Sequence, residues 1–293
     1  MSTVQNPKTV VLEAQVGGHA GVLTSEDGEL LIKPALAREL GFYQQMQNDE
    51  TLSALLPYVP KFIGTLRLEG EVDEILENIS YPFLKPNIMD IKLGTVLHDD
   101  GASAEKVARM IETARKTTSL ETGVRLTGFQ VYDNVTGLAV NTPKSYGKSI
   151  KAADLPEGIA KFFPVGKPAP ESSNGLSASL LRQILPAIRD EIKEIRDVFS
   201  ELELRMVGGS LLIVYEGDWT RAQEGVDRMY EEEASDEEED EEDAKKKPGP
   251  PFVVKLIDFA HTKVVPGQGP DEGVLLGMDT VLRLLDGRIK EIA

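Results

Sequence analysis

The sequence predicts an α+β fold, in which a small β-rich part comes first and a larger part with long helices follows. In the first 80 residues, short apolar runs alternate with glycine-rich turns around a single helical pattern. Farther along, two amphipathic patterns of helical period cover residues 104–117 and 177–202. Two β-branched runs follow, at residues 210–215 and 252–257. Strands and helices gathered into separate stretches are typical of this fold class.

The first part, residues 1–80, predicts a small lobe of five strands and one helix. The expected strands are residues 10–16, 21–24, 30–33, 62–68 and 72–79. Pro34 opens the helical pattern, since proline is accepted in the first turn of a helix. The apolar face of that helix consists of Leu36, Leu40, Tyr43 and Met46. Apolar residues at this spacing pack against a core.

The second part, residues 81–293, begins with a helix that has two distinct faces. Its apolar face is formed by Val107, Met110, Ile111 and Ala114. Lys106 and Arg109 project from the other side, where they form either a solvated surface or a binding surface. The later helix, at residues 177–202, has a continuous apolar stripe that predicts burial in the core. Pro186 predicts a kink or a split in it.

Charge is distributed unevenly along the chain. The 293 residues include 49 acidic and 32 basic ones, for a net charge of −17, and 11 acids lie within residues 231–243. Such a run cannot bury enough apolar surface to offset the entropy of ordering. We therefore expect a disordered insertion at about residues 223–250, between two paired strands. Residues 85–167, by contrast, hold 12 basic and nine acidic residues.

Composition excludes several classes of site. The absence of cysteine excludes disulfides, thiolate metal sites and cysteine nucleophiles, and the three histidines are far apart in sequence. No apolar run approaches the roughly 20 residues that a membrane-spanning helix needs, and the first residues do not resemble a signal peptide. We expect a reducing compartment, the cytosol or the nucleus, no direct binding of nucleic acid, and a monomer.

Two short segments contain residues suited to phosphate chemistry. Asp90 and Lys92, two residues apart in a strand-like run, share one face. This pair can anchor a hydroxyl and neutralise a developing phosphoryl charge, or it can be a surface ion pair of little energetic value. Asp258 ends an apolar strand and is followed by Phe259 and His261. An aspartate there can bind magnesium or cap a turn.

A third pair of residues belongs to the first lobe. Lys33 ends a predicted strand, and Glu39 follows six residues later on the predicted helix. A strand lysine held by a helix glutamate presents a cation to ATP phosphates in kinase-like lobes. Along the chain, Lys33 and Glu39 come before Asp90, Lys92 and Asp258. This order is more informative than any one of the features alone.

These segments resemble the inositol polyphosphate kinases. Residues 86–94, PNIMDIKLG, contain every defined position of that family's PxxxDxKxG signature. Residues 257–262 read IDFAHT, and residues 209–212, GSLL, differ from the family's SSLL only at the first position. Weaker similarities are QVGGH at residues 15–19, LENI at 76–79 and YGKS at 146–149. They occur in the family's order from about Gln15 to near the C-terminus.

The resemblance implies a two-lobed, protein-kinase-like fold with a small helical inositol-binding insert at about residues 97–122. The first lobe would bind ATP and the second would carry catalysis, with ATP and Mg²⁺ as cofactors. The resemblance assigns ATP contacts to Lys33, Glu39, Glu77, Ile79, Asp90 and Asp258. It assigns the metal to Asp258 and Ser210, inositol phosphates to Lys92, Lys106, Arg109 and His261, and catalysis to Asp90 and Lys92. Asp90 is expected to anchor the ribose or to act as a base.

The resemblance also implies an activity and a location. The short chain and its acidic insertion favour the fungal multikinase branch, which phosphorylates soluble inositol trisphosphate to tetrakis- and pentakisphosphate. The alternatives are an inositol hexakisphosphate kinase and a transcription-complex scaffold whose acidic loop binds basic protein partners. Nuclear as well as cytoplasmic residence follows from the resemblance alone.

Overall fold

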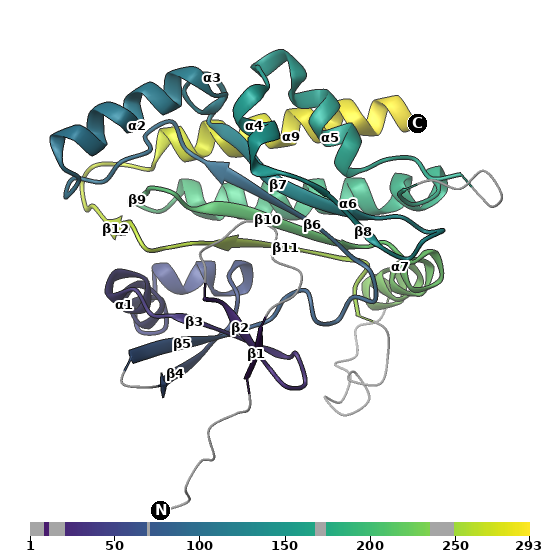
Figure 1. The fold of residues 1–293 in the computed structure, drawn as a ribbon, viewed down its shortest axis with the longest axis horizontal. Helices are drawn as coiled ribbons and strands as arrows, with labels where there is room; N and C mark the ends of the chain where they lie inside the picture. The colour runs from purple at the N-terminus through teal and green to yellow at the C-terminus, as the bar shows by residue number, and fades with distance from the viewer. Residues whose placement is uncertain (1–8, 12–20, 69–70, 168–173, 235–248) are drawn as a thin grey trace, which may run out of the picture.

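The computed structural model describes residues 9–11, 21–68, 71–167, 174–234 and 249–293. Two five-stranded sheets form two lobes, with the N-terminal lobe below and the C-terminal lobe above in Figure 1. The α+β, two-lobed fold predicted from the sequence is confirmed by this architecture. Residues 15–19, with the QVGGH segment, lie outside the described residues.

The N-terminal sheet is antiparallel and has the strand order β1-β2-β3-β5-β4. Its strands are β1 (Thr9–Val11), β2 (Leu23–Ser25), β3 (Leu30–Pro34), β4 (Phe62–Leu68) and β5 (Glu71–Glu77). Helix α1 (Ala37–Met46) and the 3-10 helix η1 (Leu52–Tyr58) lie between β3 and β4 in the chain. The register places Lys33 of β3 opposite Glu74 of β5, so their side chains share one face of the sheet.

The predicted start of α1 is wrong by three residues. Pro34 still belongs to β3, where it pairs with Asp73, and the helix begins at Ala37. The strand conformation wins because β5 continues to pair with β3 up to this position. Tyr43 and Met46 are buried as predicted, but Leu36 is exposed because it precedes the helix. The strand predicted at residues 72–79 ends at Glu77, and residues 10–16 are described only as far as Val11.

The C-terminal sheet has the order β11-β10-β6-β7-β8, and its paired strands are antiparallel. Its strands are β6 (Pro86–Leu93), β7 (Val124–Tyr132), β8 (Ala139–Thr142), β10 (Ser210–Glu216) and β11 (Phe252–Ile257). The predicted pairing of the runs at 210–215 and 252–257 is confirmed, because β10 pairs with β11. A separate two-stranded sheet joins β9 (Leu204–Met206) to β12 (Thr262–Val264).

Helices surround the C-terminal sheet. They are α2 (Ala104–Lys116), α3 (Ser119–Thr122), α4 (Lys144–Ser149), α5 (Leu155–Phe162), α6 (Ala178–Ser200), α7 (Trp219–Ala234) and α9 (Glu272–Ile292), with a 3-10 turn η2 (Ala152–Asp154). Helices α6 and α9 pack on each other, and α6 also contacts β11 and η1. The described helices do not include one with the length and apolar character needed to cross a bilayer.

Helix α6 is not split at Pro186. The helix runs unbroken from Ala178 to Ser200, although an internal proline removes a hydrogen bond and costs about 3 kcal/mol. Leu185 and Ile188, on either side of the proline, are completely buried. Burying such side chains contributes about 1.5–3 kcal/mol each, which offsets the cost. The predicted apolar stripe of this helix is confirmed.

The predicted start of the disordered insertion, residue 223, is wrong, because α7 continues to Ala234. The carboxylate of Asp218 accepts hydrogen bonds from the backbone N–H groups of Thr220 and Arg221 and so caps the helix. Ala222 and Val226 are fully buried, so an apolar face holds α7 against the core. The most acidic part of the predicted insertion, residues 235–248, lies outside the described residues.

A partly buried carboxylate on α6, that of Glu191, makes the stability of the fold depend on pH. Burial raises the pKa of Glu191 to about 7, and Glu194 adds to the rise, whereas Lys255 and the backbone N–H of Val254 oppose it. Because the folded pKa exceeds that of an exposed glutamate, the folded state retains a proton that the unfolded state has lost. The contribution of this group to stability therefore falls as pH rises from about 4.5 to 7.

We predict that Glu191→Gln stabilises the protein at pH 8 by about 1–3 kcal/mol, because it removes a buried charge while retaining the shape. At pH 4.5 the gain should shrink below about 0.5 kcal/mol, since the folded glutamate is already protonated there. Denaturant unfolding at the two pH values measures this difference. Glu201→Gln, which changes an exposed carboxylate just after α6, is the matched control. Equal gains at both pH values would contradict the prediction.

Candidate active site

The predicted Lys33–Glu39 pair is present, and a third residue joins it. Lys33 Nζ lies 2.9 Å from Glu39 Oε1 and 3.1 Å from Glu74 Oε1. Both carboxylates are buried, and Glu74 is completely so. Burial alone would lower the pKa of Lys33, but Glu39 and Glu74 outweigh it and raise that pKa. Lys33 therefore stays charged while most of its surface is enclosed.

The second predicted cluster forms around Lys92 in the C-terminal lobe. Its Nζ donates to the backbone oxygen of Gly208 at 2.8 Å, to Ser210 Oγ at 3.0 Å and to Asp258 Oδ2 at 3.0 Å. The strand register explains this, because Ser210 of β10 pairs with Lys92 on one side and with Ile257 on the other. Asp258 follows Ile257 directly. Three segments far apart in sequence thus bring their polar groups to one point.

The two clusters are joined through the backbone after Asp258. Asp258 has a φ of +67°, the one positive value among the described residues other than glycine. Aspartate tolerates this left-handed conformation better than most residues do. The turn places the N–H of Phe259 3.1 Å from Glu39 Oε1, the same oxygen that holds Lys33. Phe259 is buried against Phe42, with ring centroids 5.0 Å apart.

Asp90 lies beneath this cluster. It is only 2% exposed, and Thr127 Oγ1 donates to its Oδ1 at 3.2 Å. Burial raises the pKa of Asp90, Lys92 opposes the rise, and Asp258 adds to it. A raised pKa suits a proton acceptor near neutral pH, but both ligand roles expected of Asp90 stay predictions. Ser210 is fully buried, and its oxygen accepts a hydrogen bond from Lys92, so its metal role also stays a prediction.

Arg125 of β7 is a site residue that the sequence interpretation missed. It pairs directly with Lys92 in the register of β6 and β7, so it shares the face that carries Lys92. Burial lowers the pKa of Arg125, and the carboxylate of Asp90 opposes this. No ion pair holds its guanidinium within the described part of the chain. Its strand neighbours are unremarkable in sequence, and only the pairing of β7 with β6 identifies it.

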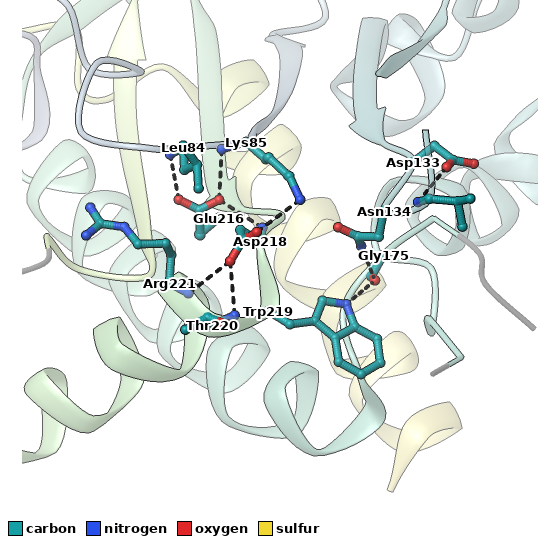
Figure 2. Close-up of polar contacts among 11 residues, drawn as sticks. Leu84, Lys85, Asp133, Asn134, Gly175, Glu216, Asp218, Trp219, Thr220 and Arg221 are labelled. Atoms are coloured by element: carbon teal, nitrogen blue, oxygen red, sulfur yellow. Dashed lines mark hydrogen bonds and ion pairs between the residues drawn. The ribbon is translucent and has the colours of Figure 1, made fainter. Parts of the chain in front are cut away.

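The segment between the lobes is fixed at both ends. Near its start, Asn78 donates from Nδ2 to the backbone oxygen of Gly28 at 2.8 Å. Near its end, both carboxylate oxygens of Glu216 accept backbone N–H groups, from Leu84 at 2.7 Å and from Lys85 at 2.9 Å (Figure 2). Lys85 Nζ also contacts Asp218 at 3.0 Å. These contacts hold the linker at a constant position relative to β10.

Two of the expected nucleotide contacts, Glu77 and Ile79, lie at the start of this linker. The N–H of Glu77 donates to the backbone oxygen of Lys61, whereas the N–H of Ile79 has no hydrogen-bond partner within the described ranges. Ile79 belongs to a small apolar cluster against which Leu212 and Val253 pack while remaining partly exposed. An apolar surface beside a free backbone donor suits a flat heterocycle.

A cavity of about 1030 Å³ adjoins the Lys92 cluster. Its lining includes Thr95 and His261, which come shortly after Lys92 and Asp258 in the chain. Its charged and imidazole side chains are Arg38, His98, Asp99, Asp100, Arg205, His261, Lys263 and Asp271. Asp99 Oδ2 lies 2.7 Å from His261 Nδ1 and 3.2 Å from Arg38 Nη1.

The structure separates the residues expected to bind inositol phosphate. His261 borders the cavity, whereas Lys92, Lys106 and Arg109 are not among its lining residues. Both lie on α2, whose N-terminus is capped by Ser103. Ala114 is buried but Ile111 is 41% exposed, so the apolar face of α2 is only partly packed against the rest of the protein. Arg38, on α1, is a further cation of this cavity that the sequence interpretation missed.

The donor set fits a divalent cation only together with a phosphorylated ligand. Within the described residues, no three histidine, aspartate or glutamate side chains gather into a metal-binding cluster. Asp258 provides one partly exposed carboxylate. Mg²⁺ usually takes only one or two protein carboxylates and completes its shell with water and phosphate oxygens. The site therefore fits a metal ion that arrives bound to phosphates.

A strand lysine held by a helix glutamate, facing an Asp-x-Lys strand and a terminal aspartate, defines a phosphotransferase of the protein-kinase-like class. Comparison with known proteins gives the family. The inositol polyphosphate kinase family model matches residues 74–286. The chain is 30% identical over 96% of its length to the inositol polyphosphate multikinase of Saccharomyces cerevisiae, and the match covers 98% of that protein. The chain belongs to the inositol polyphosphate kinase family.

Further relatives and solved structures of inositol phosphate kinases are also similar to this chain. Human inositol hexakisphosphate kinase 1 is 28% identical over 72% of the chain, but the match covers only 51% of that protein. The S. cerevisiae multikinase Ipk2, in complex with ADP and Mn²⁺, has a TM-score of 0.70 at 30% identity. That match covers 89% of this chain and all of the other. A second multikinase structure, with a TM-score of 0.62 at 21% identity, shows the same fold.

We predict that Asp258→Asn reduces kcat by at least about 100-fold and leaves the melting temperature nearly unchanged. Asparagine tolerates the left-handed backbone, so the turn that joins the clusters persists, while the charge expected to hold a metal ion is lost. Steady-state kinetics and thermal unfolding of the same preparation measure the two quantities. Asp279→Asn, at an exposed ion pair on α9, is the control. Unchanged kcat would contradict the assignment of Asp258.

Proposed function

We propose that this protein is an inositol polyphosphate multikinase, which transfers the γ-phosphoryl group of ATP to hydroxyls of inositol tris- and tetrakisphosphate with Mg²⁺. The observation that carries the proposal is the continuous connection from Lys33 through Glu39 and Phe259 to Asp258 and Lys92. It joins the phosphate-binding groups of both lobes. The full-length match to a multikinase, against half-length matches to hexakisphosphate kinases, supports this branch.

The proposed nucleotide site lies between the lobes. The adenine ring packs on Leu212 and Val253, and the backbone at Glu77 and Ile79 bonds its edge. Lys33 contacts the phosphates while Glu39 holds its position. Asp258 would hold Mg²⁺, which would supply neutralising charge at the terminal phosphates. Binding nucleotide across two lobes whose linker is fixed by Glu216 orients the γ-phosphate toward Lys92.

The proposed transfer step is an in-line displacement. A hydroxyl oxygen of the inositol ring bonds to the γ-phosphorus, the bond to the bridging oxygen breaks, and ADP leaves. Lys92 stabilises the charge on the transferred group through its ammonium. Gly208, Ser210 and Asp258 accept hydrogen bonds from that ammonium and hold it in position. The hydroxyl proton leaves to water or to Asp90, whose raised pKa suits that role. Arg125, beside Lys92, adds a second positive charge.

The proposed acceptor site is the cavity beside Lys92, with α2 as its outer part. Arg38 and Lys263 offer positive charge inside it and His261 offers an imidazole, and each of the three contacts Asp99 or Asp100. Substrate phosphates would compete with these carboxylates for the same cations. Lys106 and Arg109 would hold phosphates that extend beyond the cavity. An open arrangement of this kind suits several related substrates.

We further propose that the protein resides in both nucleus and cytoplasm. These compartments are reducing, and a chain without cysteine does not depend on disulfides. We propose a monomer whose acidic segment, residues 231–243, can attract basic protein partners. If a variant without that segment keeps its kinase activity, the segment is not needed for catalysis, and any role it has lies in binding partners.

The first test of the proposed function is a product profile. Purified protein with ATP and Mg²⁺ is given inositol tris-, tetrakis-, pentakis- and hexakisphosphate in parallel, and products are resolved by anion-exchange chromatography. We predict conversion of tris- to pentakisphosphate with hexakisphosphate unchanged. Turnover of hexakisphosphate would instead place the protein in the pyrophosphate-forming branch. ATP binding without any turnover would reject the kinase proposal and favour a scaffold.

A second test separates the acceptor site from the nucleotide site. We predict that Lys106→Ala with Arg109→Ala raises the KM for inositol trisphosphate by about 10- to 100-fold and changes the KM for ATP less than about twofold, because charge-assisted phosphate contacts are lost on α2 alone. Lys116→Ala is the control on the same helix, since Lys116 already pairs with Glu112 at 3.2 Å. Equal changes in both KM values would contradict the assignment.

A further inference from the structure

Glu74 gives the lysine of the nucleotide site a second carboxylate. Lys33 lies 3.1 Å from Glu74 Oε1 as well as 2.9 Å from Glu39 Oε1. Glu74 is fully buried, and within the described residues neither of its oxygens has a hydrogen-bond partner of good geometry, although Lys33 Nζ lies close to one of them. A buried carboxylate with such poor solvation is costly when ionised. The lysine thus balances one of two nearby negative charges.

Among the described residues, Lys33 is the cation that acts on the Glu74 carboxylate. On β3 it faces Lys33, on α1 it faces Glu39 and the unpartnered hydroxyl of Tyr43, and across β4 it pairs with the uncharged Thr65. Burial raises the pKa of Glu74 to about 7, with Lys33 opposing and Glu39 adding to the rise. Near neutral pH the carboxyl is therefore balanced between its two forms.

We infer that Glu74 takes up a proton from solvent when nucleotide phosphates bind Lys33, so that Glu74 is a positioning residue that makes nucleotide binding depend on pH. The inference rests on the proposed contact between Lys33 and those phosphates. Phosphates on Lys33 consume the positive charge that stabilises the ionised Glu74, and they add negative charge nearby. The proton restores the balance, and Lys33 remains held by Glu39 while it faces the nucleotide.

Linkage fixes the direction of the effect. A group that binds a proton only in the complex weakens nucleotide binding as pH rises above its free-state midpoint, by up to about tenfold per pH unit. For Glu74 the window begins near pH 7. The affinity for ADP should therefore fall about three- to tenfold between pH 7 and pH 8 in the wild-type protein. Glu74→Gln, which mimics the protonated form, should remove this fall.

Calorimetry of ADP binding with Mg²⁺ tests the inference. Titrations at pH 7.5 in HEPES and in Tris, two buffers with different ionisation enthalpies and no phosphate, give the number of protons taken up. We expect Glu74→Gln to lower that number by about 0.3 to 0.8 relative to wild type and to flatten the pH dependence of the affinity. Asp73→Asn, one residue earlier on β5 and on the other face of the strand, is the matched control.

Three results would overturn the inference. The first is a wild-type protein whose ADP affinity does not change between pH 7 and pH 8, a measurement that needs no variant. The second is an unchanged proton count in Glu74→Gln when Lys33→Met has lost ADP affinity, which rejects the linkage while leaving the nucleotide role of Lys33 intact. The third is an unchanged ADP affinity in Lys33→Met, which rejects both the proposed phosphate contact and the linkage.

Discussion

One carboxylate oxygen connects the two lobes at the site. Glu39 Oε1 accepts a hydrogen bond from Lys33 Nζ at 2.9 Å and another from the backbone N–H of Phe259 at 3.1 Å. Because both donors share a single buried oxygen, the position of α1 sets the distance between Lys33 and the turn that carries Asp258. Charge-assisted hydrogen bonds in an enclosed site are short and strong. Loss of Glu39 would uncouple the halves of the site.

Sheet register places the remaining groups. Ser210 of β10 lies between Lys92 of β6 and Ile257 of β11, so Lys92 and Asp258 converge over its hydroxyl. Fully buried apolar residues on these strands, such as Leu211 and Leu256, hold the register. A shift of one residue would turn their side chains to the opposite face, so packing of the core and alignment of the catalytic groups are the same constraint.

Several cations of the site lie beside carboxylates of the same chain. Lys33 is balanced by Glu39 and Glu74, Lys92 by Asp258, and Arg38 by Asp99. These pairs keep each cation oriented, because a partner carboxylate replaces part of the water that burial removes. Phosphate groups are stronger acceptors and can take over those cations one at a time. This arrangement explains how a chain of net charge −17 can receive polyanions.

Local sequence determined the elements and the chemical types at the site, because hydrophobic period, turn residues and short signatures act over a few residues. The strand at 62–68, the helix at 104–116, the stripe of α6 and the groups Lys33, Glu39, Lys92 and Asp258 were predictable for that reason. Glu74, Arg125 and Arg38 were not, since each acquires its role from a neighbouring strand or lobe. The order in α7 and the unbroken α6 were likewise decided by burial against distant residues, which outweighs local charge and an internal proline.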